Sequence, residues 1–487
     1  TGEIYPAVVY VKNGFIAHVE TEKLEGPYGA LEIYDGEGRY LIPGLIDSHM
    51  HIESSMMTPR NFARVVIPHG TTTIIHDPHE LANVYGVDAV KYMHDSADDL
   101  PMRQLVDIPS CVPAVPGCEN AGAEFFAGEI RELAKLKRVV GLAEVMDFYG
   151  VMNGDERMMD IIEAAQESGL YLQGHAPGLG GRQLSAYLCG GPNTCHETTN
   201  GEEALGKLRA GMYVDARESS ITKNVKAIVE GIQGIRFYDT LTLCSDDRES
   251  DDLLHTTINT AREIGVSHIG AVAPGYTADM VLTKDIHTMW ADAVFYGGKL
   301  VAEHGKLTVE IEDREYEMET RNSMNAGNVS LDDFIVKAPV ENGTVKVHVM
   351  EYHDLLQSMT RCAVEELEVK DNKVVLGEGM AFVAVINRHG KGTKALGIVK
   401  NFGSSEGAIA STVSHDSHNL TIVYFKPEDA LAAAKELIAK GGGMTAVKDG
   451  VVLNTLRLEV GGLMTRLNAE ELTKEAARMK EVERGLG

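Results

Sequence analysis

Residues 41–51 read LIPGLIDSHMH, an apolar run that ends in two histidines separated by one residue. Short apolar runs interrupted by proline and glycine are typical of strands and their boundaries. In an extended segment the side chains at positions i and i+2 point to the same side, so His49 and His51 can reach one ion. The run therefore predicts a buried strand with a metal site at its carboxyl end.

Seven further apolar or β-branched runs follow, separated by helical patterns, at residues 71–75, 105–108, 139–145, 171–175, 193–195, 212–216 and 241–245. The sixth and seventh strands of the series have the weakest patterns. Helices are expected at residues 83–94, 124–136 and 158–167. Eight strands with interleaved helices predict a (β/α)8 TIM barrel over residues 44–269.

Hairpin patterns flank this barrel. One centres on Asn13-Gly14 and the other on Gly297-Gly298, each between β-rich runs. Asn-Gly and Gly-Gly are favoured in two-residue hairpin turns. We expect one small composite β domain built from residues 1–43 and 270–320.

The composition changes after about residue 320. Strands are expected at residues 379–386 and 420–424, and helices at 427–440 and 468–484. These elements predict an additional C-terminal α/β domain over residues 321–487.

Charge and composition restrict the class of protein. The 487 residues carry a formal net charge of −27, which would repel a phosphate backbone, so we expect no nucleic-acid partner. The longest apolar runs are short of the ~20 residues that a membrane helix needs, so we expect no membrane partner. Six scattered cysteines without a C-x-x-C pair favour a reducing, cytoplasmic location. Base rates favour a homo-oligomer.

Later strand ends carry further potential metal ligands, namely Glu144, His175, His196 and Asp246. The carboxyl ends of barrel strands converge on one mouth. Together with the two histidines of the first strand, these side chains suffice for two divalent ions about 3.5–4 Å apart.

Several segments resemble one enzyme family. Residues 42–51 resemble the first barrel strand of the amidohydrolase superfamily. Further matches resemble the bacterial-type adenine deaminases in particular, and lie at residues 52–56, 76–80, 258–261, 269–275 and 414–419.

The resemblance implies a ligand set for two divalent metal ions, Mn or Fe with Zn as an alternative: His49, His51, Glu144, His175, His196 and Asp246. Relatives such as the dihydroorotases use a carboxylated lysine at the strand end where Glu144 lies. The absence of a lysine there argues against the cyclic-amide branch.

The resemblance also implies hydrolytic deamination of adenine to hypoxanthine and ammonia, in purine salvage. A hydroxide held between two cations would attack C6 of the purine. We expect Asp246 to move its proton toward the leaving amino group. The proton for N1 would come from Glu53, Glu80 or Glu197, and the sequence leaves that choice open.

Two polar clusters each have two possible roles. His76, Asp77 and His79 would line the purine pocket or orient the ligands, or else cap the following helix. His415, Asp416 and His418 would close the barrel mouth over substrate, or would form a polar turn.

The sequence leaves two alternative functions open. One is another amidohydrolase activity, on a different purine or on a cyclic amide, and another is a catalytically silent metal-binding barrel. Between Asp247 and Thr257 the chain is shorter than is usual in the family. Either this connection is truly short or residues beside the active site are missing from the sequence.

Overall fold

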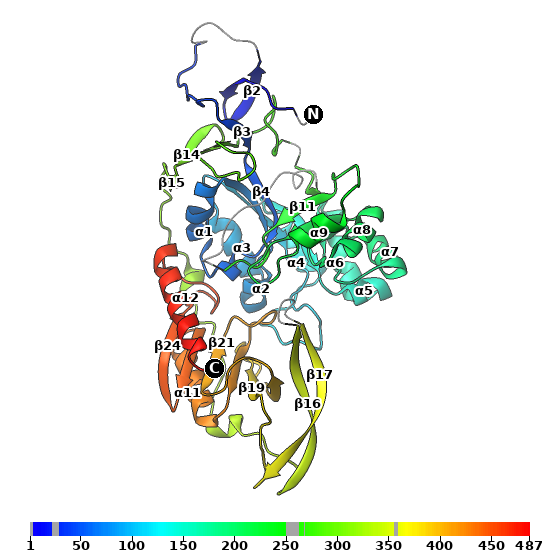
Figure 1. Ribbon diagram of the computed structural model, residues 1–487, viewed down its shortest axis with the longest axis vertical. Helices are drawn as coiled ribbons and strands as arrows, with labels where there is room; N and C mark the ends of the chain where they lie inside the picture. The colour runs from blue at the N-terminus through cyan, green and yellow to red at the C-terminus, as the bar shows by residue number, and fades with distance from the viewer. Residues whose placement is uncertain (1–2, 22–28, 250–262, 267, 355–358) are drawn as a thin grey trace.

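Three regions follow one another along the long axis of the molecule (Figure 1). The structure, a computed structural model, describes residues 3–21, 29–249, 263–266, 268–354 and 359–487. A small β region lies at one end, a barrel in the middle and a C-terminal region at the other end. None of the helices in these described ranges is both long and apolar enough to cross a membrane.

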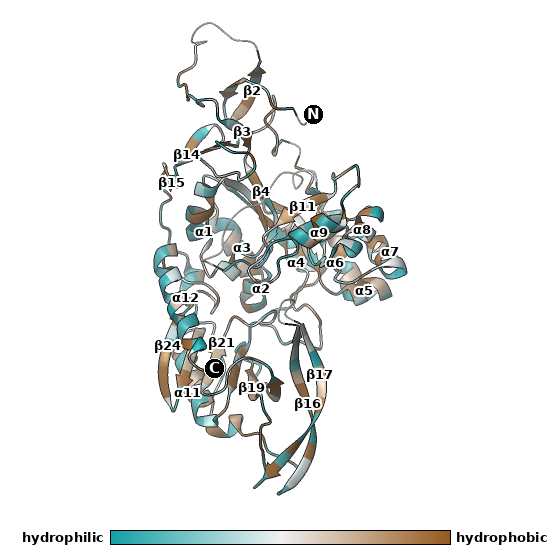
Figure 2. Ribbon diagram, in the orientation of Figure 1, coloured by the Kyte–Doolittle hydropathy of each residue, from teal (hydrophilic) through white to brown (hydrophobic). Residues whose placement is uncertain are grey.

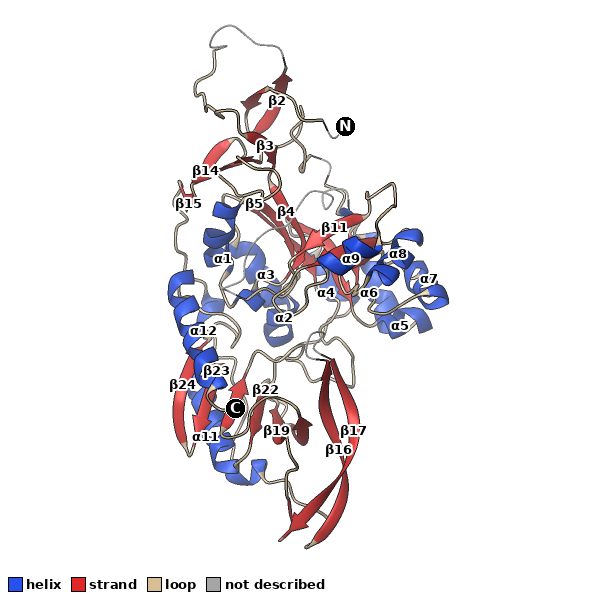
Figure 3. Ribbon diagram, in the orientation of Figure 1, coloured by secondary structure: helices blue, strands red, loops and turns tan. Residues whose placement is uncertain are grey.

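Parallel strands form the wall of the middle region, and helices surround them (Figure 3). Among the described residues eight strands build this wall: β4 (Leu45–Met50), β5 (Thr71–His76), β6 (Arg103–Ile108), β7 (Val139–Val145), β8 (Tyr171–Gly174), β9 (Thr194–Cys195), β10 (Tyr213–Arg217) and β11 (Leu241–Cys244). Strands β4 to β8 pair in parallel in chain order, and so do β9 to β11.

Backbone hydrogen bonds join these two sheets at both seams. Asn193 N donates to Leu172 O at 3.3 Å, which places the start of β9 beside β8. Asp246 N donates to His49 O at 3.0 Å, which places the end of β11 beside β4. The prediction of a TIM-type barrel is therefore confirmed.

Helices alternate with the strands and turn their apolar faces toward the wall: α1 (Pro59–Val66), α2 (His79–Tyr85), α3 (Val87–Ser96), α4 (Ala127–Leu133), α5 (Phe148–Asn153), α6 (Glu156–Glu167), α7 (Gly181–Cys189), α8 (Gly201–Arg209) and α9 (Val225–Gly231). Short 3-10 turns lie at η1 (Glu53–Ser55) and η2 (Ile67–His69). The helix expected over residues 83–94 is two helices, because Gly86 with φ 64° breaks it.

Segments before and after the barrel share one antiparallel sheet. Its strands are β3 (Tyr40–Pro43), β12 (Met280–Thr283), β13 (Ala293–Tyr296), β14 (Lys299–Glu303) and β15 (Lys306–Leu307), with β3 paired to β12. The hairpin of β1 (Val8–Lys12) and β2 (Phe15–Glu20) packs against it, with Ile16 buried among Ala278 and Met280. The boundaries of the three domains stay a prediction.

The C-terminal region is built on one mixed sheet, which has nine strands in the part of the chain that the structure describes. They are β16 (Gly343–Asp354), β17 (Met359–Lys370), β18 (Lys373–Val374), β19 (Met380–Ile386), β20 (Lys394–Lys400), β21 (Ala408–Ser411), β22 (Leu420–Tyr424), β23 (Gly443–Lys448) and β24 (Val451–Arg457). Its helical elements are η3 (Glu317–Thr320), η4 (Leu331–Phe334), α11 (Pro427–Lys440) and α12 (Ala469–Arg484).

The barrel and the C-terminal region share one apolar core. Met57 and Phe62, at the start of the barrel, belong to the same buried cluster as Leu463, Met464 and Leu472. Helix α12 carries many polar residues, coloured teal in Figure 2, and buries one face against α1 and β24. This shared core fixes the C-terminal region over the barrel mouth.

Candidate metal centre and active site

The six predicted metal ligands come from the carboxyl ends of five barrel strands. His49 lies in β4 and Glu144 in β7, while the others follow their strands within two residues: His51 after β4, His175 after β8, His196 after β9 and Asp246 after β11. All six are buried or nearly so. Because parallel barrel strands open at one face, the six side chains converge there.

Two carboxylates organise this cluster. Asp246 Oδ1 lies 3.3 Å from both His49 Nε2 and His51 Nε2. Glu144 Oε2 lies 2.5 Å from His175 Nδ1 and 3.1 Å from His196 Nε2. Glu144 Oε1 lies 3.5 Å from His51 Nε2. The Glu144 carboxylate therefore contacts His175 and His196 with one oxygen and approaches His51 with the other.

The donor set fits divalent metal ions. In one group, His49, His196 and Asp246 offer ligand atoms within 4.8 Å of one another, and a second such group is Glu144, His175 and His196. That spacing is what one ion requires of ligands bound at about 2.0–2.3 Å.

Unsatisfied ring nitrogens support the same conclusion. Both nitrogens of His49 and Nδ1 of His196 are buried and have no hydrogen-bond partner among the residues that the structure describes, which is unusual in a folded protein. His51 Nδ1 lies 2.9 Å from the Asp77 carbonyl oxygen, an arrangement that orients a histidine whose other nitrogen binds metal.

Opposite charges keep both carboxylates ionised. Burial alone would raise the pKa of Glu144, but the imidazoles of His196 and His175 hold that pKa well below its usual range. Burial likewise opposes ionisation of Asp246, and the Arg217 guanidinium lowers its pKa well below the usual value. Both side chains therefore present anionic oxygens at neutral pH.

Arg217, the last residue of β10, is a site residue that our sequence analysis missed. Its Nη1 lies 2.5 Å from Glu197 Oε1 and 2.5 Å from Asp246 Oδ2, and its Nη2 lies 3.0 Å from Glu197 Oε2. The guanidinium thus clamps two carboxylates of the site. The signal that could have found it is its place at the end of a predicted barrel strand.

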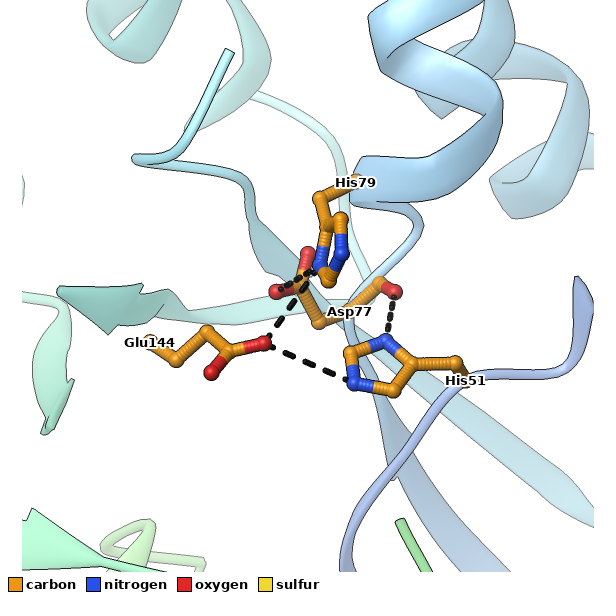
Figure 4. Close-up of side chains that lie close together, drawn as sticks. All are labelled: His51, Asp77, His79 and Glu144. Carbon is orange, nitrogen blue, oxygen red and sulfur yellow. Dashed lines mark hydrogen bonds and ion pairs between the residues drawn. The ribbon is translucent and has the colours of Figure 1, made fainter. Parts of the chain in front are cut away.

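Residues 76–80, with the sequence HDPHE, place some side chains at the pocket and others in the interior behind it. Figure 4 shows His79 beside Asp77 and Glu144, with His79 Nδ1 2.9 Å from Asp77 Oδ2 and 3.5 Å from Glu144 Oε1. His76 is not one of the residues that line the pocket. Burial lowers the His76 pKa to about 3, so its imidazole is neutral.

The three glutamates that could supply the N1 proton lie in different places relative to the pocket. Glu197 lines the pocket, whereas Glu53 and Glu80 lie behind it. Burial, together with the nearby Glu80 carboxylate, raises the pKa of Glu53 to about 8. The Ser54 hydroxyl lies 2.6 Å from both Glu80 Oε1 and Asp247 Oδ1, and so connects Glu80 to Asp247 in the pocket wall.

The C-terminal region covers the mouth of the barrel. His415 and Asp416 line the pocket, while His418 is fully buried with its Nε2 3.9 Å from Glu80 Oε2. Met146 and Asp247, which the sequence analysis did not single out, complete the wall. The polar segment over residues 415–418 is therefore part of the site.

Comparison with known proteins places this site in a family. Residues 40–252 match the family model described as amidohydrolase family, and residues 357–487 match the adenine deaminase C-terminal domain. The chain is 39% identical over 516 residues to the adenine deaminase of Moorella thermoacetica, covering 99% of this chain and 86% of that protein. The chain belongs to the adenine deaminase family. It is also 36% identical to adenine deaminase 2 of Carboxydothermus hydrogenoformans, over 100% of this chain and 87% of that protein.

As a member of the adenine deaminase family the protein is a metal-dependent hydrolase, which agrees with its buried histidine and carboxylate groups. The resemblance that we drew from the sequence is confirmed. Two of its features, the segment at residues 258–261 and the short connection before Thr257, fall in residues 250–262, outside the described residues.

Proposed function

We propose that the protein catalyses the hydrolytic deamination of adenine to hypoxanthine and ammonia, as a step of purine salvage. The observation that carries this proposal is the convergence of four histidines and two carboxylates on one barrel mouth. The substrate follows from the family, because the relatives that match almost the whole chain are named adenine deaminases.

Two divalent cations, Mn or Fe with Zn as the alternative, would be held by the six ligands, with Glu144 in contact with both groups. Imidazole and carboxylate ligands accept all three metals, and availability decides among them. When bound, such cations supply Lewis acidity that lowers the pKa of water and provides a nucleophile near neutral pH.

The chain's own side chains then handle the protons. Attack of water at C6 of adenine places electron density on N1, which requires an acid there. Of the three candidate glutamates, Glu197 alone lines the pocket, so we assign the N1 proton to it: its carboxylate takes up one proton of the attacking water and delivers it to N1. Asp246 takes the second proton of that water and passes it to the amino group, which leaves as ammonia.

Arg217 supports both roles by holding Glu197 and Asp246 in one arrangement. A bidentate guanidinium fixes the direction in which each carboxylate points. Proton donor and acceptor are thereby kept on the same side of the pocket.

Cellular location and assembly complete the proposal. We place the enzyme in the cytoplasm, because all six cysteines are free thiols and a reducing compartment keeps them so. We expect a homo-oligomer, because most oligomeric proteins are built from identical subunits.

The test is the ultraviolet spectrum of adenine incubated with the full chain loaded with Mn²⁺ or Fe²⁺, beside a chelated control. Metal-dependent conversion to the hypoxanthine spectrum, with release of ammonia, is the expected result. Protein that binds two metals and leaves adenine unchanged would refute the assigned substrate, and a panel of other purines and cyclic amides would follow.

A further inference from the structure

Asp416 presents an unused hydrogen-bond acceptor to the pocket. It lines the pocket, and its side chain is only 25% exposed. Across the described ranges no hydrogen bond to its carboxylate is found, and its nearest cationic neighbours, His79 and His415, both lie 3.9 Å away. A partly buried carboxylate that no protein donor reaches is free to accept a hydrogen bond from a ligand.

The segment that carries Asp416 is held firmly from the side away from the pocket. Arg388, which is fully buried, donates to His418 O at 2.5 Å, to Ser323 Oγ at 2.6 Å and to Gly461 O at 2.8 Å. A guanidinium fixed at three acceptors defines the backbone position of its neighbours. The carboxylate is thus preorganised before any ligand enters.

Further bonds hold the residue next to Asp416. His389 Nε2 lies 2.8 Å from Ser417 O, and Ser417 Oγ donates to Glu119 Oε2 at 2.8 Å. The second of these bonds joins the C-terminal region to the barrel. The position of Asp416 relative to the metal ligands is therefore set by both regions.

His79 links Asp416 to the ligand cluster along the wall of one pocket. Its Nδ1 lies 3.5 Å from Glu144 Oε1 and its Nε2 lies 3.9 Å from Asp416 Oδ1, so Asp416 is one imidazole ring away from the predicted ligands. If C6 of the base lies at the ligand cluster, the imidazole half of the same bicycle extends away from the cluster. That half carries the N–H group of a free base.

We infer that Asp416 accepts a hydrogen bond from the imidazole N–H of the bound base and so selects free purine bases over nucleosides. This inference rests on the proposed function, because it places a purine with C6 at the ligand cluster. A nucleoside or 9-methyl purine has no N9–H to donate, and it sets a substituent against the segment of residues 415–418. A site built to bond an N–H group rejects analogues that lack it, because its acceptor is left unpaired.

The experiment measures binding of the reaction product, so it does not depend on turnover. Calorimetry gives Kd for hypoxanthine and for 9-methylhypoxanthine with the full-length, Mn²⁺-loaded wild type, Asp416→Ala and Asp416→Asn. We expect Asp416→Ala to weaken hypoxanthine about 10- to 100-fold, the effect of one hydrogen bond to a charged group. Binding of 9-methylhypoxanthine should not weaken and should improve, because the variant removes an acceptor that this ligand leaves unpaired.

The asparagine variant separates a direct contact from a structural effect. Its amide oxygen still accepts a hydrogen bond, so Asp416→Asn should recover much of the affinity for hypoxanthine. The matched control is Asp449→Ala, which removes an exposed carboxylate paired with Lys426 in the same region. It should change neither Kd.

Three outcomes with the variants would overturn the inference. They are an equal loss of affinity for both ligands, no loss for either, and a lower metal content of Asp416→Ala, which would make Asp416 a metal ligand. A wild type that does not bind hypoxanthine would overturn it as well. Failure of the proposed function would look different, since loaded protein would then bind both metals and leave adenine intact.

Discussion

Replacing Arg217 by glutamine should damage both the stability of the metal-free protein and the turnover of the loaded enzyme. The side chain is 8% exposed, and its guanidinium contacts Glu197 and Asp246 together. Glutamine is shorter and carries no charge, so the two carboxylates would face each other without a cation between them.

The expected size follows from this geometry. Removing one partner of a buried ion pair costs about 3–5 kcal/mol, because the remaining charge stays buried. In the loaded enzyme the bound cations compensate Asp246 in part, so about 3 kcal/mol, or about 100-fold in kcat/KM, is the expected loss. For Arg217→Lys we expect a loss of kcat/KM smaller than that of Arg217→Gln but still measurable. The lysine keeps the positive charge, but one ammonium cannot hold both carboxylates in a bidentate arrangement.

The assays are urea unfolding of the metal-free protein and steady-state deamination by the Mn²⁺-loaded protein. Arg131→Gln is the matched control, because Arg131 pairs with Glu167 on the surface with half of its side chain exposed. An exposed pair of this kind contributes about 0–1 kcal/mol. If Arg217→Gln matched Arg131→Gln in both assays, the clamp between the two carboxylates would have no energetic role.

Three other changes test separate parts of the site. Asp246→Asn should keep most of its metal, measured by plasma emission, yet lose about 10²–10⁴-fold in kcat, because the amide cannot take up a proton. Asp107, buried on β6, has its pKa raised from 3.8 to about 8 by burial, so the folded state holds a proton that the unfolded chain releases. Stability should therefore fall as pH rises between these values and level off above them. Urea titrations at about pH 5 and pH 8.5 should show a smaller difference for Asp107→Asn than for the wild type, and the part due to Glu53 should persist. Chelation should abolish deamination and lower the thermal midpoint, and added Mn²⁺ should restore both; a midpoint unmoved by chelation would mean that the metals do not stabilise the fold.

Much of the fold could be predicted, because its buried strands are short apolar runs and its helices carry apolar residues at helical spacing. The run over residues 139–145 coincides with β7, and the pattern over residues 427–440 coincides with α11, where apolar residues recur at helical spacing. The long hairpin of β16 and β17 was not expected. Its strands mix exposed charged and apolar residues, and pairing with β20 depends on contacts far away in the chain.

The site was predictable wherever the strand-end rule applies to a residue type that binds metal. That rule singled out the six predicted ligands, which the structure brings together, but not Arg217, because an arginine at a strand end does not indicate chemistry until its carboxylate partners are placed. The sequence could not distinguish Glu197, which lines the pocket, from Glu53 and Glu80, which do not. A buried glutamate and a pocket glutamate look the same in the sequence until the fold is known. For the same reason the sequence could not decide whether residues 415–418 cover the barrel mouth.

The apolar core shared by α1 and α12 has a consequence for how such proteins diverge. The two helices belong to opposite ends of the chain, yet they pack against each other and bury residues in one cluster. A recombination between relatives near residue 320 would pair one parent's α1 with the other's α12, and neighbouring core positions are energetically coupled. The two ends of the gene are therefore constrained to change together, and the segment that covers the pocket is inherited with the barrel beneath it.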